Sequence, residues 1–183
     1  AEQAAKKIQE INAQCLVQTH THAIDETNVN SILKEYDIII DGTDNFAAKF
    51  LINDACVLEN IPYSHGGILR FDGQTMTIKP KESACYRCVF NVPPPANAVP
   101  TCSQAGVLGA IAGMLGTMQA AECLKFITGA GELLTNKLLA FDAKTMSFRK
   151  VNLKRNLKCA VCGDHPTITS LVDGEQAVCD IKK

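Results

Sequence analysis

The sequence predicts an α/β fold with a doubly wound sheet. Along residues 1–60, segments with the periodicity of helices alternate with segments typical of strands. One of them, residues 37–41, contains three consecutive isoleucines, which is typical of an interior strand in a parallel sheet. A βαβα order is the pattern that a doubly wound sheet requires. At 183 residues, the chain is long enough for one domain with a small appendage.

The first part of the chain is predicted to form five elements. The opening helix is amphipathic, because Ala4, Ala5, Ile8 and Ile11 recur on one face. In chain order the elements are a helix over residues 1–14, a strand over 15–24, a short helix over 28–36, the buried strand over 37–41 and a helix over 44–60.

The second part of the chain is predicted to contain two hairpins and a long helix. Asp72-Gly73 is a strong hairpin signal and predicts a turn at residues 71–73. Gly129 and Gly131 are expected to end the long helix. In chain order the elements are strands over residues 61–70 and 73–80, an exposed crossover loop over 91–101 that holds four of the seven prolines, a helix over 104–128, a hairpin over 137–153 and a cysteine-bearing tail.

The composition is that of a soluble globular protein and argues against two classes of partner. Charged residues make up 20% of the chain and the formal net charge is −1, so the basic surface that nucleic-acid binding demands is missing. The longest apolar run, residues 105–121, is interrupted by Thr117 and Gln119 and studded with glycines. It therefore favours a buried core helix over a membrane span.

The cysteines indicate a reducing compartment. Nine cysteines occur without a recognisable export signal, so we expect free or metal-bound thiols in the cytoplasm. Cys15, Cys56 and Cys123 fall on apolar faces and are expected in the core. The chain has no initiator methionine and begins within a predicted helix, so we expect it to be a fragment.

The first candidate site follows the buried strand. Asp44 and Asn45 lie between that strand and the next helix, at the carboxyl edge of the predicted sheet, where open α/β folds bind ligands. A carboxylate there can hold Mg²⁺ against nucleotide phosphates. The alternative is that Thr43 or Asp44 caps the helix. The sequence has no glycine-rich phosphate loop of either common type.

The second candidate site consists of two C-x-x-C pairs, Cys85 with Cys88 and Cys159 with Cys162. Four thiolates suit tetrahedral Zn²⁺, and the long separation between the pairs means that the metal would attach the tail to the body of the protein. A thioredoxin-like redox pair and four unrelated buried thiols are the alternatives.

The third candidate is Cys102, which follows the proline-rich loop and precedes a helix. The positive end of a helix can lower the pKa of a nearby thiol, which favours a nucleophilic thiolate. The alternative is a small residue packed beneath the loop. His20 and His22 share a strand face that could bind metal, but their alternation with Thr19 and Thr21 favours an exposed strand face.

Five ordered motifs resemble the ThiF/MoeB/HesA family, the bacterial relatives of ubiquitin-activating enzymes. The resemblance extends from about residue 1 to residue 172. The motifs are "DGTDNFAAKFLINDACV", "SHGGILRFDGQ", "ACYRCVF", "TCSQAGVLGAIAGMLGTMQAAECLKFITG" and "CAVCGDHPTIT".

The resemblance implies a fold and a reaction. The fold is a Rossmann-like sheet of the ubiquitin-activating-enzyme type with a structural Cys₄ zinc site. The reaction is the adenylation, with Mg²⁺ and ATP, of the C-terminal Gly-Gly carboxylate of a small β-grasp sulfur-carrier protein. Such enzymes serve thiamine or molybdopterin biosynthesis and are commonly homodimers, to which the apolar helix after Gly106 could contribute an interface.

The resemblance also assigns roles to residues. Asp44 and Asn45 match the ATP site, with Asp44 as the carboxylate associated with Mg²⁺. The two C-x-x-C pairs match the zinc ligands. Cys102 matches a cysteine that forms a thioester or acyl-disulfide with the carrier in some members and is dispensable in others.

Two departures from the family pattern stand out. The upstream half of the family domain, with its glycine-rich loop and phosphate-binding arginine and lysine, has no counterpart here. Residues 1–183 are therefore expected to be a single unit equivalent to the C-terminal two-thirds of an adenylation domain. Residues 152–183 are expected to form a tail that zinc attaches to this unit. Lys49 stands where relatives often carry arginine. A non-catalytic, zinc-stabilised module that binds a β-grasp partner is therefore the main alternative, and a nicotinamide-dependent oxidoreductase is a weaker one.

Overall fold

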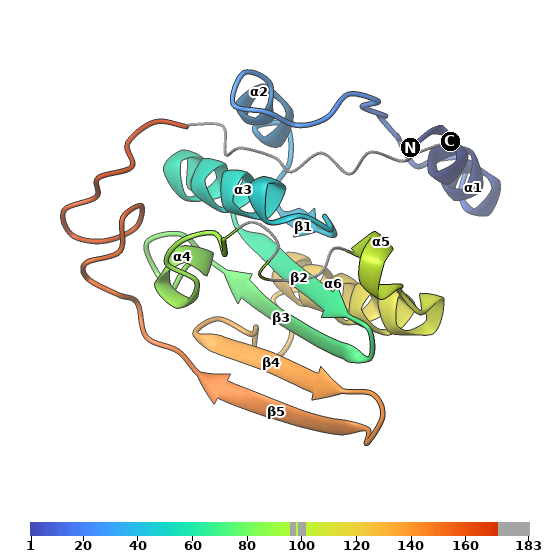
Figure 1. The fold of residues 1–183 in the computed structure, drawn as a ribbon. Coiled ribbons are helices and arrows are strands. Elements are labelled where there is room, and N and C mark those ends of the chain that lie inside the picture. Colours follow the sequence, from blue (N-terminus) through green and yellow to red (C-terminus); the bar gives the residue numbers. More distant parts are fainter. Residues whose placement is uncertain (96–97, 99–101, 172–183) are drawn as a thin grey trace.

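The computed structural model describes residues 1–95, 98 and 102–171 (Figure 1). The elements in chain order are α1 (Glu2–Ile11), α2 (Val29–Leu33), β1 (Ile39–Asp41), α3 (Phe46–Glu59), β2 (Tyr63–Leu69), β3 (Asp72–Ile78), α4 (Tyr86–Val89), α5 (Cys102–Ala105), α6 (Gly109–Thr128), β4 (Lys137–Asp142) and β5 (Ser147–Asn152). The α/β class and most of the expected elements are confirmed.

The sheet of the described residues has the strand order β1-β2-β3-β4-β5 and is mixed. β1 and β2 are parallel, whereas every later pair is antiparallel. The expected parallel winding is therefore confined, in this part of the chain, to the first two strands and the helix α3 that connects them.

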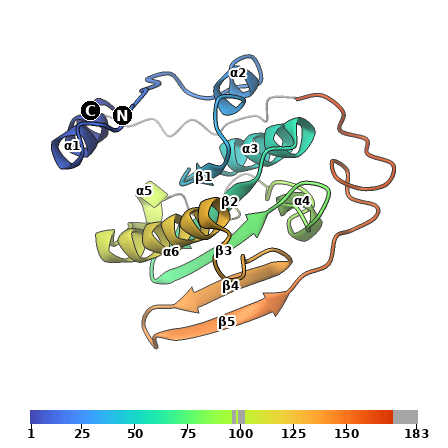
Figure 2. The ribbon, with the colours of Figure 1, turned by 180° about the vertical axis from the view of Figure 1, so that it is seen from behind.

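The strand predicted over residues 15–24 is absent from the structure, and this prediction was wrong. The segment is irregular, and Leu16 is fully exposed. A strand needs a neighbour to complete its backbone hydrogen bonds, and no described strand lies beside this segment. The preceding helix α1 forms as predicted, but none of its residues is buried, and it lies apart from the sheet in both views (Figures 1 and 2).

Two helices cover opposite faces of the sheet, because side chains alternate along each strand. On β2, Tyr63 and His65 point toward α3, whereas Gly66 faces α6. α6 accordingly lies behind the sheet in Figure 1 and in front of it in Figure 2. The larger apolar core lies on the α3 side and includes Tyr63, Met76 and Ile78, so α3 is enclosed between the sheet and the elements around it.

The sequence at both ends of α3 explains where the helix begins and ends. The side-chain oxygen of Asn45 accepts a hydrogen bond of 2.8 Å from the backbone N–H of Ala48, which caps the first turn. Asn60 adopts the left-handed conformation, with φ 58°, and ends the helix. The ten residues 48–57 are all buried. The cap is therefore supplied by Asn45, and not by Thr43 or Asp44.

The Asp72-Gly73 pair lies in β3, so the turn predicted at residues 71–73 is displaced. Leu69 pairs directly with Asp72, which leaves Arg70 and Phe71 as the loop, and Arg70 takes the positive φ of 57° that a two-residue loop uses. Gly73 lies opposite Phe141 on β4. A Cβ atom at this position would come within 2.1 Å of the phenylalanine ring, so the glycine is required by packing across the sheet.

α6 begins at Gly109 and not at residue 104 as predicted. The short helix α5 ends before Gly106, which has a φ of 74°, and Val107 then forms a parallel bridge with Arg70. Gly129, with φ 68°, ends α6 as expected. The helix predicted to lie in the core is buried on one side only: the buried residues are Ile111, Leu115, Gln119 and Glu122, and most of the rest are exposed. No helix among the described residues is long and apolar enough to cross a membrane.

Candidate functional site

The first candidate site lies where β1 ends and α3 begins. Asp41 is the last residue of β1 and is 1% exposed. A short loop then leads through Asp44 to Asn45, the cap of α3. Asp44 is exposed, and its carboxylate makes no hydrogen bond or ion pair with the described residues. The structure thus places Asp44 at the carboxyl end of β1, as predicted, with its charge open to a ligand.

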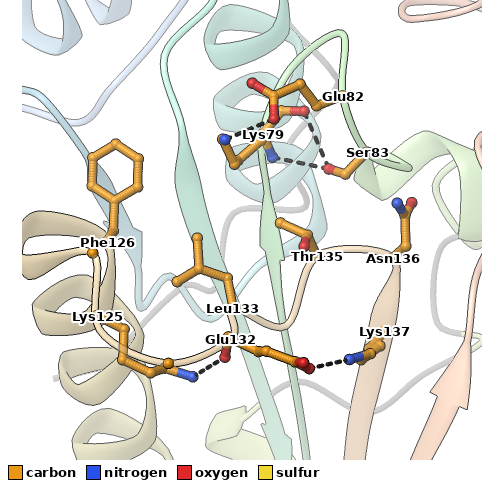
Figure 3. Close-up of a pocket in the computed structure, with 12 residues that line it drawn as sticks. Lys79, Glu82, Ser83, Lys125, Phe126, Glu132, Leu133, Thr135, Asn136 and Lys137 are labelled. Carbon is orange, nitrogen blue, oxygen red and sulfur yellow. Dashed lines mark hydrogen bonds and ion pairs between the residues drawn. The ribbon is translucent and has the colours of Figure 1, made fainter.

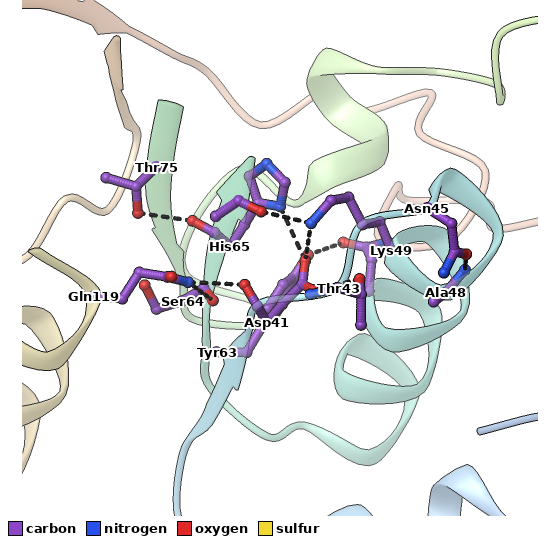
Figure 4. A network of polar contacts seen from close by, with 12 residues as sticks. Asp41, Thr43, Asn45, Ala48, Lys49, Tyr63, Ser64, His65, Thr75 and Gln119 are labelled. Atoms are coloured by element: carbon purple, nitrogen blue, oxygen red, sulfur yellow. Dashed lines mark hydrogen bonds and ion pairs between the residues drawn. The ribbon is translucent and has the colours of Figure 1, made fainter. Parts of the chain in front are cut away.

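Asp41 is the centre of a buried polar network that the sequence did not reveal (Figure 4). One carboxylate oxygen accepts hydrogen bonds from the backbone N–H and the hydroxyl of Thr43, at 2.9 and 2.7 Å. The other oxygen accepts from Lys49 Nζ at 3.0 Å and contacts His65 Nδ1 at 3.2 Å. Lys49 also donates to the backbone carbonyl of Gly66 at 2.5 Å.

The environment determines the charges in this network. Burial alone would raise the pKa of Asp41, but the hydrogen bond from His65 and the charge of Lys49 outweigh it and lower the pKa to about 2. Burial lowers the pKa of His65. At neutral pH, Asp41 is therefore ionised and His65 is neutral. Because an ionised carboxylate only accepts hydrogen bonds, the proton of His65 lies on Nδ1, and Nε2 has no partner among the described residues.

α6 is attached to the same network from the other face of the sheet. Gln119 Nε2 donates to the backbone carbonyls of Asp41 and Ser64, at 2.9 and 3.0 Å. A Cβ atom at position 66 would approach the Gln119 side chain to 2.6 Å. Gly66 therefore leaves the room through which Gln119 reaches the first two strands.

The four cysteines of the C-x-x-C pairs come together at the second candidate site. Their sulfur atoms all lie within 4.8 Å of one another. Cys85 Sγ lies 3.8 Å from Cys88 and 3.6 Å from Cys159, and Cys88 Sγ lies 3.3 Å from Cys162. With Zn–S bonds of about 2.3 Å, a tetrahedral site requires sulfur separations of about 3.8 Å. The arrangement therefore fits a tetrahedral metal ion.

The backbone around the four thiols supports such a site. The N–H of Asn156 donates to Cys88 Sγ at 3.3 Å, and Arg155 binds the carbonyl of Cys162 through two nitrogens. Gly163 lies so close to the Cys159 carbonyl that a Cβ atom would come within 2.4 Å of it. Hydrogen bonds from the neighbouring thiols, with Cys162 first, hold the pKa of Cys159 well below its usual range. Within the described residues, this is the cluster of potential ligands that could hold a metal ion.

A second polar network, also missed in the sequence, joins the first cysteine pair to α3. The Asn53 side-chain oxygen accepts hydrogen bonds from Tyr63 Oη and the backbone N–H of Tyr86, at 2.8 and 2.9 Å. Arg87 binds both carboxylate oxygens of Asp54, each at 2.7 Å, and its guanidinium lies 4.6 Å from the centre of the Phe50 ring. No local pattern indicates these contacts, because the partners are far apart in the sequence.

The remaining predicted residues are placed only in part. Cys102 is the first residue of α5, and its side chain lies outside the described residues, as does most of the proline-rich loop. Cys56 is fully buried, as expected, whereas Cys15 is exposed and Cys123 is half-buried, so the prediction of a core position was wrong for Cys15. The described histidines His20 and His22 belong to no metal-binding group.

A separate cavity of about 520 Å³ lies between the end of β3, the C-terminal end of α6 and the loop before β4 (Figure 3). Three lysines line it, and each is paired: Lys79 with Glu82, Lys137 with Glu132, and Lys125 with Glu122. None of the predicted site residues borders the cavity. We therefore assign it no role in the candidate site.

Comparisons with known proteins show which sequences this chain resembles. Residues 1–161 match the ThiF family. The adenylyltransferase and sulfurtransferase MOCS3 of Culex quinquefasciatus is 43% identical over 176 residues, which cover 96% of this chain and 40% of that protein. The sulfur carrier protein adenylyltransferase of Thermus thermophilus is 41% identical over 184 residues, which cover 98% of this chain and 68% of that protein.

Solved structures share the fold. Escherichia coli MccB with ATP superposes with a TM-score of 0.74 at 21% identity, over 88% of this chain and 50% of that chain. MccB with AMPCPP and MccA gives a TM-score of 0.75 at the same identity. The chain thus spans half of MccB and less than half of the Culex protein.

Proposed function

Because this chain belongs to the ThiF family, we propose that it is part of an enzyme that uses ATP to adenylate the C-terminal Gly-Gly carboxylate of a small β-grasp sulfur-carrier protein. The observation that carries the proposal is the exposed carboxylate of Asp44 at the carboxyl end of β1, which has no partner among the described residues, in a chain that is 41% identical to a sulfur carrier protein adenylyltransferase. Ligands of open α/β sheets bind at this edge.

The chemistry requires a charged, well-aligned site. A carboxylate is a poor electrophile, and its mixed anhydride with AMP supplies the leaving group for a later attack by sulfur. Asp44 is the residue that would hold Mg²⁺, which neutralises the phosphates of ATP. Asn45 keeps α3 capped beside it, so that the carboxylate lies at the positive end of the helix. Alignment of the two substrates supplies the rest of the rate enhancement.

The four cysteines would hold Zn²⁺ in a structural role. All four positions of a tetrahedral ion would be occupied by Cys85, Cys88, Cys159 and Cys162, which leaves none for a substrate. The cluster joins the segment after β5 to the start of α4, and it fits a reducing compartment such as the cytoplasm, where thiols remain available for metal. Cys102 is the candidate nucleophile for a covalent adduct with the carrier.

We also propose that two copies associate through α6. The outer face of this helix is apolar and exposed, with Leu124 and Ile127 62% and 66% exposed. A Cβ atom added at Gly113 or Gly116 of the same helix would meet no atom of another described element within 4 Å, so a second helix can approach closely. The pathway is thiamine or molybdopterin biosynthesis.

An ATP–pyrophosphate exchange assay with a candidate carrier tests the function. It requires the complete polypeptide, because the chain covers 68% of its Thermus relative. We expect exchange that depends on the carrier and on Mg²⁺ and that is abolished by Asp44→Asn. Carrier binding without any exchange would instead support the non-catalytic, zinc-stabilised binding module.

A further inference from the structure

Asp44 has a negative charge to offer a ligand. Its carboxylate is exposed and makes no hydrogen bond or ion pair with the described residues. The position of this carboxylate therefore depends on the backbone of the loop between Asp41 and Asn45. Whatever holds that backbone also sets where the charge lies.

The loop is held at both ends by side chains. At its start, Asp41 accepts hydrogen bonds from the N–H and the hydroxyl of Thr43, at 2.9 and 2.7 Å, which closes a tight turn. At its end, Asn45 accepts from the N–H of Ala48 at 2.8 Å. Asp44 lies between these two fixed points, so only its own side-chain rotation remains free.

Asp41 is itself held from three directions (Figure 4). Lys49 reaches it from α3 at 3.0 Å, His65 from β2 at 3.2 Å, and Gln119 from α6 binds its carbonyl at 2.9 Å. The ammonium group of Lys49 thus donates to Asp41 and to the Gly66 carbonyl. It pairs with Asp41 and not with Asp44, whose negative charge stays available.

We propose that Asp41 is a positioning residue for the metal-nucleotide site: its buried carboxylate fixes the turn at Thr43 and thereby sets the position of the Asp44 carboxylate. This inference rests on the proposed function. Asp41 touches neither nucleotide nor carrier in this role. Through its contacts with α3, β2 and α6, Asp41 holds the backbone of the loop between Asp41 and Asn45 in place.

A purely structural role would also make Asp41 necessary, so the test needs a matched control. Asp54 provides it, because it is a second buried aspartate of the same region that is bound to a cation, Arg87, at 2.7 Å. In the complete polypeptide, Asp41→Asn and Asp54→Asn are both expected to lower the melting temperature. Only Asp41→Asn should raise the Mg²⁺ concentration needed for half-maximal ATP–pyrophosphate exchange, by about tenfold or more, since small misplacements of reacting groups are costly.

A milder pair of variants covers the case in which Asp41→Asn does not fold. Thr43→Val removes one donor to Asp41 and leaves the pair with Lys49 intact. Thr75→Val removes a buried hydroxyl that donates to the His65 carbonyl at 2.7 Å, outside the loop. Thr43→Val should shift the Mg²⁺ dependence in the same direction as Asp41→Asn, whereas Thr75→Val should leave it unchanged.

Asp44→Asn separates failure of this inference from failure of the proposed function. If Asp44→Asn abolishes exchange while Asp41→Asn and Thr43→Val keep the wild-type Mg²⁺ dependence, the positioning role is overturned and the function stands. Unchanged exchange in Asp44→Asn would instead remove the site on which both proposals depend.

Discussion

The side-chain oxygen of Asn53 accepts a hydrogen bond of 2.9 Å from the backbone N–H of Tyr86. This contact joins the middle of α3 to the residue that follows Cys85, and so connects the cysteine cluster to the helix that begins at the candidate nucleotide site. The Arg87 to Asp54 pair lies beside it. If the cysteine cluster becomes disordered, α3 is therefore expected to be destabilised as well.

Replacement of Asn53 by alanine should destabilise the protein strongly. The side chain is fully buried, and its loss leaves the Tyr86 N–H and the Tyr63 hydroxyl without an acceptor. Each buried donor left unpaired costs about 1–3 kcal/mol, so a loss of about 2–6 kcal/mol in the free energy of unfolding is expected by urea titration. Tyr63→Phe removes one of these hydrogen bonds without leaving a donor unpaired and should cost only about 1 kcal/mol. Equal losses in the two variants would contradict this account.

Removal of one cysteine of the cluster should release metal. We expect about one zinc ion per chain in the purified protein, and less in Cys88→Ser, because three thiolates hold the ion more weakly than four. Cys15→Ser is the matched control, since Cys15 is exposed and outside the cluster. Metal content by mass spectrometry and melting temperature with and without a chelator provide the measurements. Full zinc retention in Cys88→Ser would argue against four-cysteine coordination.

The stability of the protein should fall with acid in two steps. The pKa of His65 lies below its ordinary 6.5, so the unfolded state takes up the proton first and stability declines as the pH falls below 6.5. The pKa of Asp41 is about 2 against an ordinary 3.8, so a further decline of about 2 kcal/mol is expected between pH 4 and pH 2.

Urea titrations across this pH range measure both steps. His65→Gln should remove the upper step and reduce the lower one, because the hydrogen bond from His65 helps to lower the pKa of Asp41. If Asp41→Asn kept the full decline between pH 4 and pH 2, another carboxylate would be responsible for it.

A charge on the outer face of α6 should dissociate the proposed dimer. Leu124→Arg would place an unpaired cation in the interface, which costs about 3 kcal/mol or more and so raises the dissociation constant by about 100-fold. Leu157→Arg is the control, because Leu157 is exposed to the same degree, 60%, but lies outside α6. Sedimentation equilibrium distinguishes the two variants. A monomeric wild-type protein, or equal effects of both substitutions, would exclude this interface.

Local signals in the sequence were sufficient wherever a structure is determined by neighbouring residues. The helix predicted over residues 44–60 forms as α3, Phe46–Glu59, although its cap is Asn45 and not Thr43 or Asp44. Gly129 ends α6, and the two C-x-x-C pairs announced a thiol cluster. These features depend on hydrogen bonds and backbone preferences within one or two turns of chain, and for that reason they can be read without the fold.

The tertiary structure decided whatever depends on partners distant in the sequence. A strand pattern at residues 15–24 was not sufficient, because a strand forms only beside a neighbour that completes its hydrogen bonds. Gly73 was predicted to be a turn residue, but it lies in β3, where the absence of a side chain leaves room for the ring of Phe141. The same is true of the buried network: Asp41, Lys49, His65 and Gln119 are ordinary residues in the sequence, and the fold brings them together. Sequence alone identified Asp44 as the candidate ligand, whereas only the folded chain shows what holds it in place.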